Sequence, residues 1–257
     1  MLKKPTVATD RGARSYQEDQ HVVKHVDYEK MPGVLMAVAD GHGGTQTSSY
    51  VVGRLQADLF DSSLAYEKGD PLNALKKIFK SLNEETSNLG NHQSSGTTLS
   101  AVYVPDGKRK AYVGVIGDSP VILAKRKTSD FDISPEHNVR SNAKEKEAAV
   151  GRGGVVRDGY LWEPTLRLGL QMSRDIGYHG MGDVLLRYPD VYTLDMEEGD
   201  ALIVGTDGLL DPGHRSTREE ARRLAKLVLG GAEASDLVQD ALGRQTGDNV
   251  TAIVYRV

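Results

Sequence analysis

Four short motifs centred on aspartate contain the residues of this chain whose types and spacing could do chemistry together. Asp40, Asp118 and Asp207 each follow an apolar run typical of a buried strand, and Asp248 precedes another such run. A carboxylate at a strand end is held by the sheet but faces open space. Several of them would repel one another on converging unless a cation neutralised their charge. The pattern therefore predicts a metal centre built from carboxylates.

The richest of these motifs is Asp-Gly-His-Gly-Gly at residues 40–44. Asp-Gly pairs are common in plain turns, and that interpretation stays open for the pair alone. The glycines also allow the backbone to approach a ligand closely, which exposes the Gly41 carbonyl as an oxygen donor. His42 adds a group that transfers protons near neutral pH. Together these residues favour a catalytic loop.

A charged segment at residues 14–19 is the second candidate. It fits either a solvated charge cluster or an anion clamp beside a metal ligand. In the second interpretation Arg14 binds phosphate through its two-pronged guanidinium, and Glu18 binds a cation.

The remaining motifs are not specific one by one. Asp207 and Asp211 would share one side of a helical turn, where a helix N-terminus is the alternative explanation. Asp118 and the pair at residues 248–249 could each belong to an ordinary turn. Their order along the chain and their shared position at strand ends are hard to attribute to turns alone.

The candidate ligands are rich in oxygen, which favours Mg²⁺ or Mn²⁺ over zinc. The chain has no cysteine, so disulfides, thiolate metal sites and a cysteine nucleophile are excluded. The sequence also lacks the Gly-x-x-x-x-Gly-Lys phosphate loop, a Gly-x-Gly-x-x-Gly loop after a strand, the Gly-x-Ser-x-Gly elbow and the His-Glu-x-x-His zinc motif.

The composition is that of an ordinary globular protein, with 39% of the 257 residues hydrophobic and 26% charged. We expect one large domain, because no linker, repeat or low-complexity segment is visible. The net charge of −4 argues against nucleic acid or an anionic membrane as the main partner. The start at residues 1–5 is too short and polar for a signal peptide, and no apolar run approaches membrane-spanning length. We therefore expect a cytoplasmic protein.

Hydrophobic periodicity predicts blocks of strands separated by helices. Strands are expected at residues 21–26, 34–38, 97–104, 109–116, 121–126, 190–194, 201–206 and 250–255. Helices are expected over residues 51–60, from Asp70 and Pro71 to 82, near 142–150, from the capping box at 216–219 to about 230, and at 235–242. Residues 136–182 are otherwise polar and Gly-rich, as expected of a functional loop or flap. This order favours an α+β fold with antiparallel sheets.

As an ordered set, the motifs resemble those of the metal-dependent Ser/Thr protein phosphatases of type 2C, the PPM family. The match runs from about Thr6 to Val257. It adds the motifs Ser-Gly-Thr-Thr at 95–98, Ser-Pro-Glu-His-Asn at 134–138, Gly-Gly-Val at 153–155 and Ser-Arg at 173–174. The length is similar to that of the minimal catalytic domain of bacterial members. The resemblance implies a single catalytic domain over residues 1–257, folded as a four-layer α/β/β/α sandwich of two antiparallel sheets flanked by helix pairs.

The resemblance also assigns roles within a site of two Mn²⁺ or Mg²⁺ ions at one edge of the sandwich. Asp40 would bridge the two ions. Glu18 and the Gly41 carbonyl would complete the ligands of one ion. Asp207 and Asp248 would complete those of the other.

The same resemblance implies that Arg14 holds the substrate phosphate and that His42 protonates the leaving serine or threonine oxygen. A hydroxide bridging the ions would attack phosphorus in line, without a covalent enzyme intermediate. Asp19 and Asn249 would support the ligands from behind. Substrates would be phosphoserine and phosphothreonine proteins, with a cognate Ser/Thr kinase and its targets as partners of a monomeric enzyme.

Asp118, with Asp207 or Asp211, resembles the weaker third-metal site of many members. Two departures from the family pattern concern this region. Pro120 follows Gly-Asp-Ser where the family commonly has arginine, and Tyr178 replaces the acidic residue that usually ends Ser-Arg-x-x-Gly-Asp. Both departures fall on the third-metal edge and the flap, and they leave the residues of the two-ion core in place.

Two other interpretations remain. A scaffold with the same fold would bind partners without hydrolysis, but such proteins usually lose metal-binding acids, and here all four candidate acids are present. A phosphatase for small phosphomonoesters is compatible with the same residues, because the catalytic groups contact only the phosphate.

Overall fold

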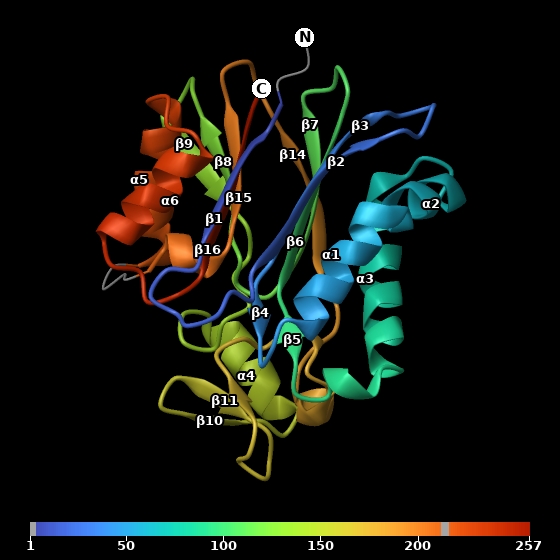
Figure 1. The fold of residues 1–257 in the computed structure, drawn as a ribbon, viewed down its shortest axis with the longest axis vertical. Helices are drawn as coiled ribbons and strands as arrows, with labels where there is room; N and C mark the ends of the chain where they lie inside the picture. Colours follow the sequence, from blue (N-terminus) through green and yellow to red (C-terminus); the bar gives the residue numbers. More distant parts are fainter. Residues whose placement is uncertain (1–3, 212–215) are drawn as a thin grey trace.

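The computed structural model describes residues 4–211 and 216–257 and shows helices packed around antiparallel sheets (Figure 1). The predicted α+β class is therefore confirmed. The first three residues of the polar start lie outside the described residues.

One five-stranded sheet contains the strand that leads to Asp40, and we call it the Asp40 sheet. Its strands in spatial order are β14 (Asp190–Asp195), β7 (Lys110–Ile116), β6 (Leu99–Pro105), β3 (Gly33–Ala39) and β2 (Gln20–Val26). Every neighbouring pair is antiparallel. Because β3 and β7 both run opposite to β6, their C-terminal ends, which lead to Asp40 and Asp118, lie at the same edge of the sheet.

The second five-stranded sheet, which we call the Asp207 sheet, supplies the other two aspartates. Its strands in spatial order are β1 (Thr6–Asp10), β16 (Val250–Arg256), β15 (Ala201–Gly205), β8 (Val121–Lys125) and β9 (Asp130–Ile133). Gly205 at the end of β15 lies opposite Ala252 near the start of β16. Antiparallel pairing therefore places Asp207, after β15, and Asp248, before β16, at the same end of the sheet.

The two sheets pack face to face, with helices on their outer faces (Figure 1). Along β3, Met36 and Val38 belong to the apolar core between the sheets, whereas Leu35 and Ala37 pack into the core under the helices. Side chains alternate between the two faces of a strand. Both faces are covered here, which explains why these strands read as continuous apolar runs in the sequence.

Three helices, α1 (Gln46–Ala57), α2 (Leu59–Tyr66) and α3 (Pro71–Ser87), cover the Asp40 sheet. The prediction of one helix over residues 51–60 is wrong. The chain leaves helical geometry at Asp58, where φ is −141°, so Leu59 and Phe60 begin a second helix. Both sides of the break carry apolar residues at helical spacing, so periodicity alone could not reveal it.

The start of α3 confirms the predicted cap. The Asp70 side chain accepts hydrogen bonds from the backbone N–H groups of Leu72 and Asn73, and Pro71 occupies the first helical position. Two further helices, α5 (Thr217–Leu229) and α6 (Ala234–Gly243), cover the outer face of the Asp207 sheet. The predicted capping box of α5 is confirmed at its first turn. None of the helices in the described chain combines the length and the apolar character needed to cross a membrane.

Residues 136–182, which we call the flap, form much of a smaller unit at one end of the sandwich (bottom of Figure 1). The unit contains α4 (Ala143–Gly151) and a sheet of β10 (Val155–Arg157), β11 (Tyr160–Trp162) and β12 (Gly169–Leu170). The predicted helix is present, and Asn142 caps it by accepting from the N–H groups of Lys144 and Glu145. The unit has an apolar cluster of its own that includes Leu161 and Val184.

A three-stranded sheet ties the flap to the motif at residues 40–44. Its strands are β13 (Ile176–Gly177), β5 (Gly96–Thr97) and β4 (Gly41–His42). Thr97 pairs with Gly41 on one side and with Ile176 on the other. The chain therefore runs from Asp40 directly into a strand that is connected to the flap.

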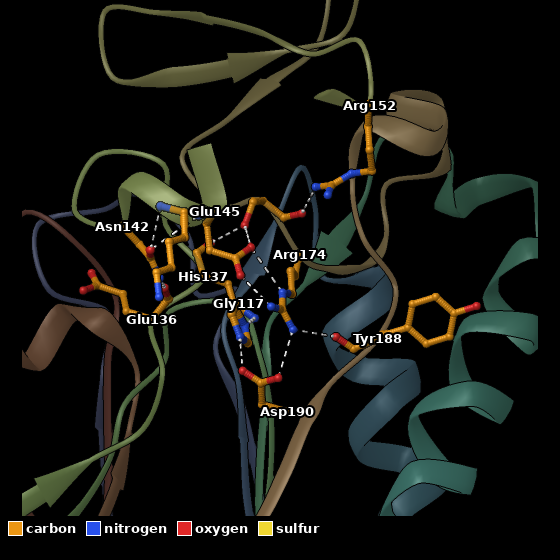
Figure 2. Close-up of polar contacts among 11 residues, drawn as sticks. Gly117, Glu136, His137, Asn142, Glu145, Arg152, Arg174, Tyr188 and Asp190 are labelled. Atoms are coloured by element: carbon orange, nitrogen blue, oxygen red, sulfur yellow. Dashed lines mark hydrogen bonds and ion pairs between the residues drawn. The ribbon is translucent and has the colours of Figure 1, made fainter. Parts of the chain in front are cut away.

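A polar network anchors the flap to the sandwich (Figure 2). Arg174 pairs with Glu145 of α4 at 2.5 Å and with Asp190 of β14 at 3.2 Å. His137 lies 3.0 Å from the other Asp190 oxygen, and its Nδ1 accepts the backbone N–H of Gly117 at 3.1 Å. Because Nδ1 accepts this hydrogen bond, the ring proton lies on Nε2, and Nε2 donates a hydrogen bond to Asp190. The network therefore connects the flap helix to the residue that precedes Asp118.

Candidate metal centre

The aspartate motifs of the two sheets meet at one edge of the sandwich. Asp40 follows β3 of one sheet, and Asp207 follows β15 of the other. The two carboxyl groups nevertheless lie close to each other, since the charge of Asp207 helps to raise the pKa of Asp40. Two carboxylates this close repel each other unless a proton or a cation neutralises one of them.

Burial and mutual repulsion favour the protonated forms of these groups. Burial is the largest cause that raises the pKa of Asp207, to about 8, and the charges of Asp118 and Asp248 add to it. The pKa of Asp40 is also raised well above its ordinary value, first by burial and then by the charges of Asp207 and Asp19. A divalent cation between them would reverse both effects.

The metal-free chain should therefore become less stable as the pH rises. In the folded state Asp207 keeps its proton up to about pH 8, whereas in the unfolded state it loses it near its ordinary pKa of 3.8. The folded state binds more protons between these values, so the free energy of unfolding falls across that window. Thermal unfolding in EDTA at pH 5 and pH 8 measures this loss of stability, and the loss should be smaller in Asp207→Asn. Equal slopes for the two proteins would contradict the assignment.

Glu18 lies beside the turn at residues 40–44. Its Oε1 accepts the backbone N–H of Gly44 at 2.5 Å, and its carbonyl accepts the hydroxyl of Ser48 at 2.7 Å. A Cβ atom on Gly41 would lie 2.6 Å from that same Glu18 carbonyl oxygen, so only glycine fits at this position. The structure thus brings Glu18 and Gly41 together, although they lie on different segments.

Asn249 holds the loop that carries Arg14 and Glu18. Its amide nitrogen donates to the carbonyls of Arg11 and Tyr16, each at 2.8 Å, and its Oδ1 accepts the backbone N–H of Glu18 at 2.8 Å. The side chain is buried, so no water can replace these bonds cheaply. Asn249 therefore fixes the loop against the start of β16.

Asp19 lies under the site. Its Oδ2 accepts the hydroxyls of Thr206 at 2.9 Å and Thr251 at 2.7 Å. Its Oδ1 is buried without a hydrogen-bond partner in the described chain, and burial raises its pKa to about 7. Because Thr206 directly precedes Asp207, Asp19 supports the segment that presents this aspartate.

Arg14 reaches the same edge from the loop before β2. Its guanidinium donates to Oδ2 of Asp248 at 2.7 Å and to the carbonyl of Gly247 at 3.0 Å. Gly12 has a φ of +59°, and a Cβ atom there would lie 2.0 Å from the Asp248 carbonyl oxygen. The close approach of this loop to β16 therefore depends on glycine.

The two other candidate aspartates have their own partners. Asp118 accepts the amide of Asn138 at 2.7 Å, and burial raises its pKa to about 6. Asp211 accepts the backbone N–H of Gly247 at 2.7 Å. Both lie close enough to Asp207 for their charges to raise its pKa. Pro120 takes part in the Asp207 sheet instead, where its carbonyl accepts the N–H of Gly205.

His42 is held by two residues of the flap. Its Nε2 lies 3.2 Å from Oδ2 of Asp175, and its ring meets Tyr178 edge-on with centroids 4.8 Å apart. Asp175 is fully buried. With Asp175 as the acceptor, Nε2 carries a proton, and Nδ1 is left as a buried ring nitrogen without a partner in the described chain.

The sequence did not reveal the roles of Asp175 and Asn138. Asp175 belongs to the segment Ser-Arg-Asp-Ile-Gly-Tyr, which stood out only because Tyr178 replaces an acidic residue. The structure shows an acidic residue three positions earlier, in contact with His42. The presence of Asp175 within a motif whose last acidic residue is replaced was the available signal. Its partner, 133 positions away, was not visible in the sequence.

The donors present fit hard divalent cations, because they are carboxylates and a carbonyl. In the described part of the chain, however, no group of three or more His, Asp or Glu side chains is already arranged to hold a metal ion. Two candidate ligands are instead engaged by the chain itself: Glu18 accepts the N–H of Gly44, and Asp248 accepts from Arg14.

A cleft of about 780 Å³ opens at this edge. Its wall includes Arg14, Asp118, Asp207, Asp211 and Asp248. Further residues come from the flap and from the start of α5. Glu18, Asp40 and His42 are not among the described residues of this wall. The cleft therefore meets one side of the carboxylate cluster, next to the cationic side chain of Arg14.

Comparison with known proteins yields a family match over most of the chain. The family model for protein phosphatase 2C matches residues 5–250. The Arabidopsis thaliana protein named "Probable protein phosphatase 2C 11" is 26% identical over 252 residues, which cover 96% of this chain and 64% of that protein. "Probable protein phosphatase 2C 52" of Oryza sativa subsp. japonica is 27% identical over 254 residues, 96% of this chain but 49% of the relative. The chain thus spans less than two thirds of these relatives.

Solved structures share the fold. A serine-threonine phosphatase 2C from Toxoplasma gondii superimposes with a TM-score of 0.75 at 19% identity, covering 99% of this chain and 95% of that one. At this identity the likeness bears on the fold alone.

Proposed function

This chain belongs to the protein phosphatase 2C family, and on that premise we propose that it hydrolyses phosphoserine and phosphothreonine in proteins with the help of divalent metal ions. The observation that carries the proposal is the half-buried pair of Asp40 and Asp207, which come from different sheets and lie so close that the charge of Asp207 raises the pKa of Asp40. Arg14, a phosphate-binding residue type, lies at the same cleft.

The donors divide between two ions. Asp40 would bridge them, Glu18 and the Gly41 carbonyl would hold one, and Asp207 and Asp248 would hold the other. Bound Mn²⁺ or Mg²⁺ would neutralise these carboxylates and supply hydroxide near neutral pH for attack on phosphorus. Asp118 and Asp211 are our candidates for a third, weaker site.

The chain's own residues would bind the phosphate and manage the proton. The Arg14 side chain is 42% exposed, and its guanidinium carries a rigid pair of donors that match two oxygens of a phosphate. In its imidazolium form His42 would carry a proton on each ring nitrogen: Asp175 would hold the ring through Nε2–H, and Nδ1 would give its proton to the leaving serine or threonine oxygen. Asn249 and Asp19 would keep the loop and the Asp207 segment in place.

We further propose that the whole chain acts as one catalytic domain and that the flap covers the substrate side of the site. Proteins carrying phosphoserine or phosphothreonine would be its substrates, and a Ser/Thr kinase with overlapping targets its functional partner.

Removal of metal tests the proposal. The purified chain should hydrolyse a phosphothreonine peptide and p-nitrophenyl phosphate with Mn²⁺ or Mg²⁺, lose both activities in EDTA, and regain them when Mn²⁺ is restored. The reason is that all proposed ligands are oxygen atoms, which leave no thiolate or imidazole to retain a metal against chelation. Activity that survived thorough chelation would rule out the carboxylate metal centre.

A further inference from the structure

Two arginines of the cleft wall have no carboxylate partner in the described chain. The guanidinium of Arg140 donates to Oε1 of Gln171 at 3.3 Å. That of Arg218 lies over the ring of Phe131, 5.0 Å from its centroid. Arg14, the third arginine in the described wall, differs because it pairs with Asp248. Both side chains are exposed and line the cleft, so each guanidinium is open to a carboxylate brought by a ligand.

Three acids of the same wall, Glu136, Glu220 and Asp211, have partners of their own, and the carboxylate of Glu136 accepts the hydroxyl of Thr217 at 3.2 Å. Glu220 lies 2.8 Å from Arg223 and 2.6 Å from Arg244. Asp211 accepts the N–H of Gly247. These acids therefore do not serve as partners for the two unpaired arginines.

The backbone of Arg140 is held in place, although its guanidinium has no carboxylate partner in the described chain. It lies in a loop that is closed by a hydrogen bond of 2.9 Å from the Asn142 amide to the carbonyl of Glu136 (Figure 2). Its backbone N–H donates to Oδ1 of Asn138, whose amide bonds to the candidate ligand Asp118. A fixed backbone reduces the entropy that the arginine loses when it binds a partner.

The Arg140 stem also rests on the flap. A Cβ atom on Gly159, in the turn between β10 and β11, would lie 3.1 Å from Cγ and Cδ of Arg140. The glycine therefore leaves room for the stem to pass over this turn. Arg218 lies in the first turn of α5 and is held differently, over the aromatic ring of Phe131 in β9. The flap and α5 thus each place one arginine side chain in the same cleft.

We propose that Arg140 and Arg218 select phosphoprotein segments that carry acidic residues beside the phosphorylated serine or threonine. The inference rests on the proposed function and extends it to the substrate class. A segment whose phosphate lies at Arg14 and which continues along the cleft in extended form passes these arginines. Guanidinium groups bind carboxylates through paired hydrogen bonds, whereas a lysine or arginine in the substrate would be repelled.

Three phosphothreonine peptides that differ only in flanking charge, acidic, neutral and basic, test this selection. The wild-type chain with Mn²⁺ should give the highest kcat/KM for the acidic peptide. Arg140→Ala and Arg218→Ala should each reduce the preference for the acidic over the neutral peptide by about fivefold, the upper range for an exposed ion pair. Arg140→Glu should make the basic peptide the better substrate, and added salt should weaken the wild-type preference.

Arg109→Ala is the matched control, because Arg109 is an exposed arginine outside the cleft wall, paired with Glu198. It removes the same charge and should leave the preference unchanged. p-Nitrophenyl phosphate has no flanking residues and reports how far each variant disturbs the catalytic centre. A wild-type chain that hydrolyses all three peptides equally, or an acidic preference that persists in Arg140→Ala and Arg218→Ala, would overturn the selection while leaving the phosphatase function intact. No hydrolysis of any substrate with Mn²⁺ would overturn the proposed function itself.

Discussion

Asp40→Asn should reduce turnover of a phosphothreonine peptide by about 10³-fold or more, because it removes the carboxylate proposed to bridge two cations. Metal ions contribute several kcal/mol of transition-state stabilisation, and each 1.36 kcal/mol corresponds to about tenfold in rate. Folding should be kept. The pKa of Asp40 is raised by burial and by the neighbouring acids, so a neutral amide suits the metal-free site at least as well.

Asp27→Asn is a suitable control, because the Asp27 side chain is 89% exposed and far from the carboxylate cluster in the fold. It should retain wild-type activity. Melting temperatures in EDTA check that Asp40→Asn is folded. A near wild-type rate for Asp40→Asn at saturating Mn²⁺ would show that Asp40 does not bridge the ions.

His42→Gln should slow hydrolysis of a phosphothreonine peptide by about 10²–10⁴-fold, the usual contribution of general acid catalysis. The effect on p-nitrophenyl phosphate should be clearly smaller, because p-nitrophenolate leaves readily without a proton. Mn²⁺ affinity should change little, since His42 is not a proposed ligand. Equal losses on both substrates would indicate that His42 positions other groups instead of donating a proton.

Asp175→Asn separates orientation from proton donation. If Asp175 acts through His42, the variant should slow the phosphopeptide more than p-nitrophenyl phosphate, as His42→Gln does. Added to His42→Gln, it should have little further effect, because residues that act as one unit are not additive. Full additivity of the two losses would contradict this positioning role. Tyr178→Phe keeps the ring against His42 and serves as the control.

Much of the fold follows from local rules that the sequence displays. Asp70 and Ser216 marked helix starts because capping depends on a side chain and the next three residues. Continuous apolar runs marked β3 and β15 because both faces of each strand are covered. The strand β9 was missed because its sequence, Asp-Phe-Asp-Ile, is short and half polar at the edge of its sheet. The strands of the flap were missed because they contain only two or three residues.

For the site, the sequence predicted which residues matter better than it predicted their contacts. Aspartates at strand ends could be foreseen to converge, because antiparallel pairing brings alternate strand ends to one edge. The pairing of Arg14 with Asp248 joins residues 234 positions apart, and that of His42 with Asp175 joins residues 133 apart. Such contacts depend on how loops pack, which periodicity and turn rules do not describe.

Mn²⁺ binding to the metal-free chain tests the carboxylate centre most directly, when electron paramagnetic resonance follows the bound ion and the same samples are assayed on a phosphothreonine peptide. We predict that activity rises as two ions bind per chain, and that Asp40→Asn loses both the paired binding and the activity. Peptide hydrolysis by a chain that holds no metal, or unchanged Mn²⁺ binding and activity in Asp40→Asn, would contradict a catalytic metal centre built on Asp40.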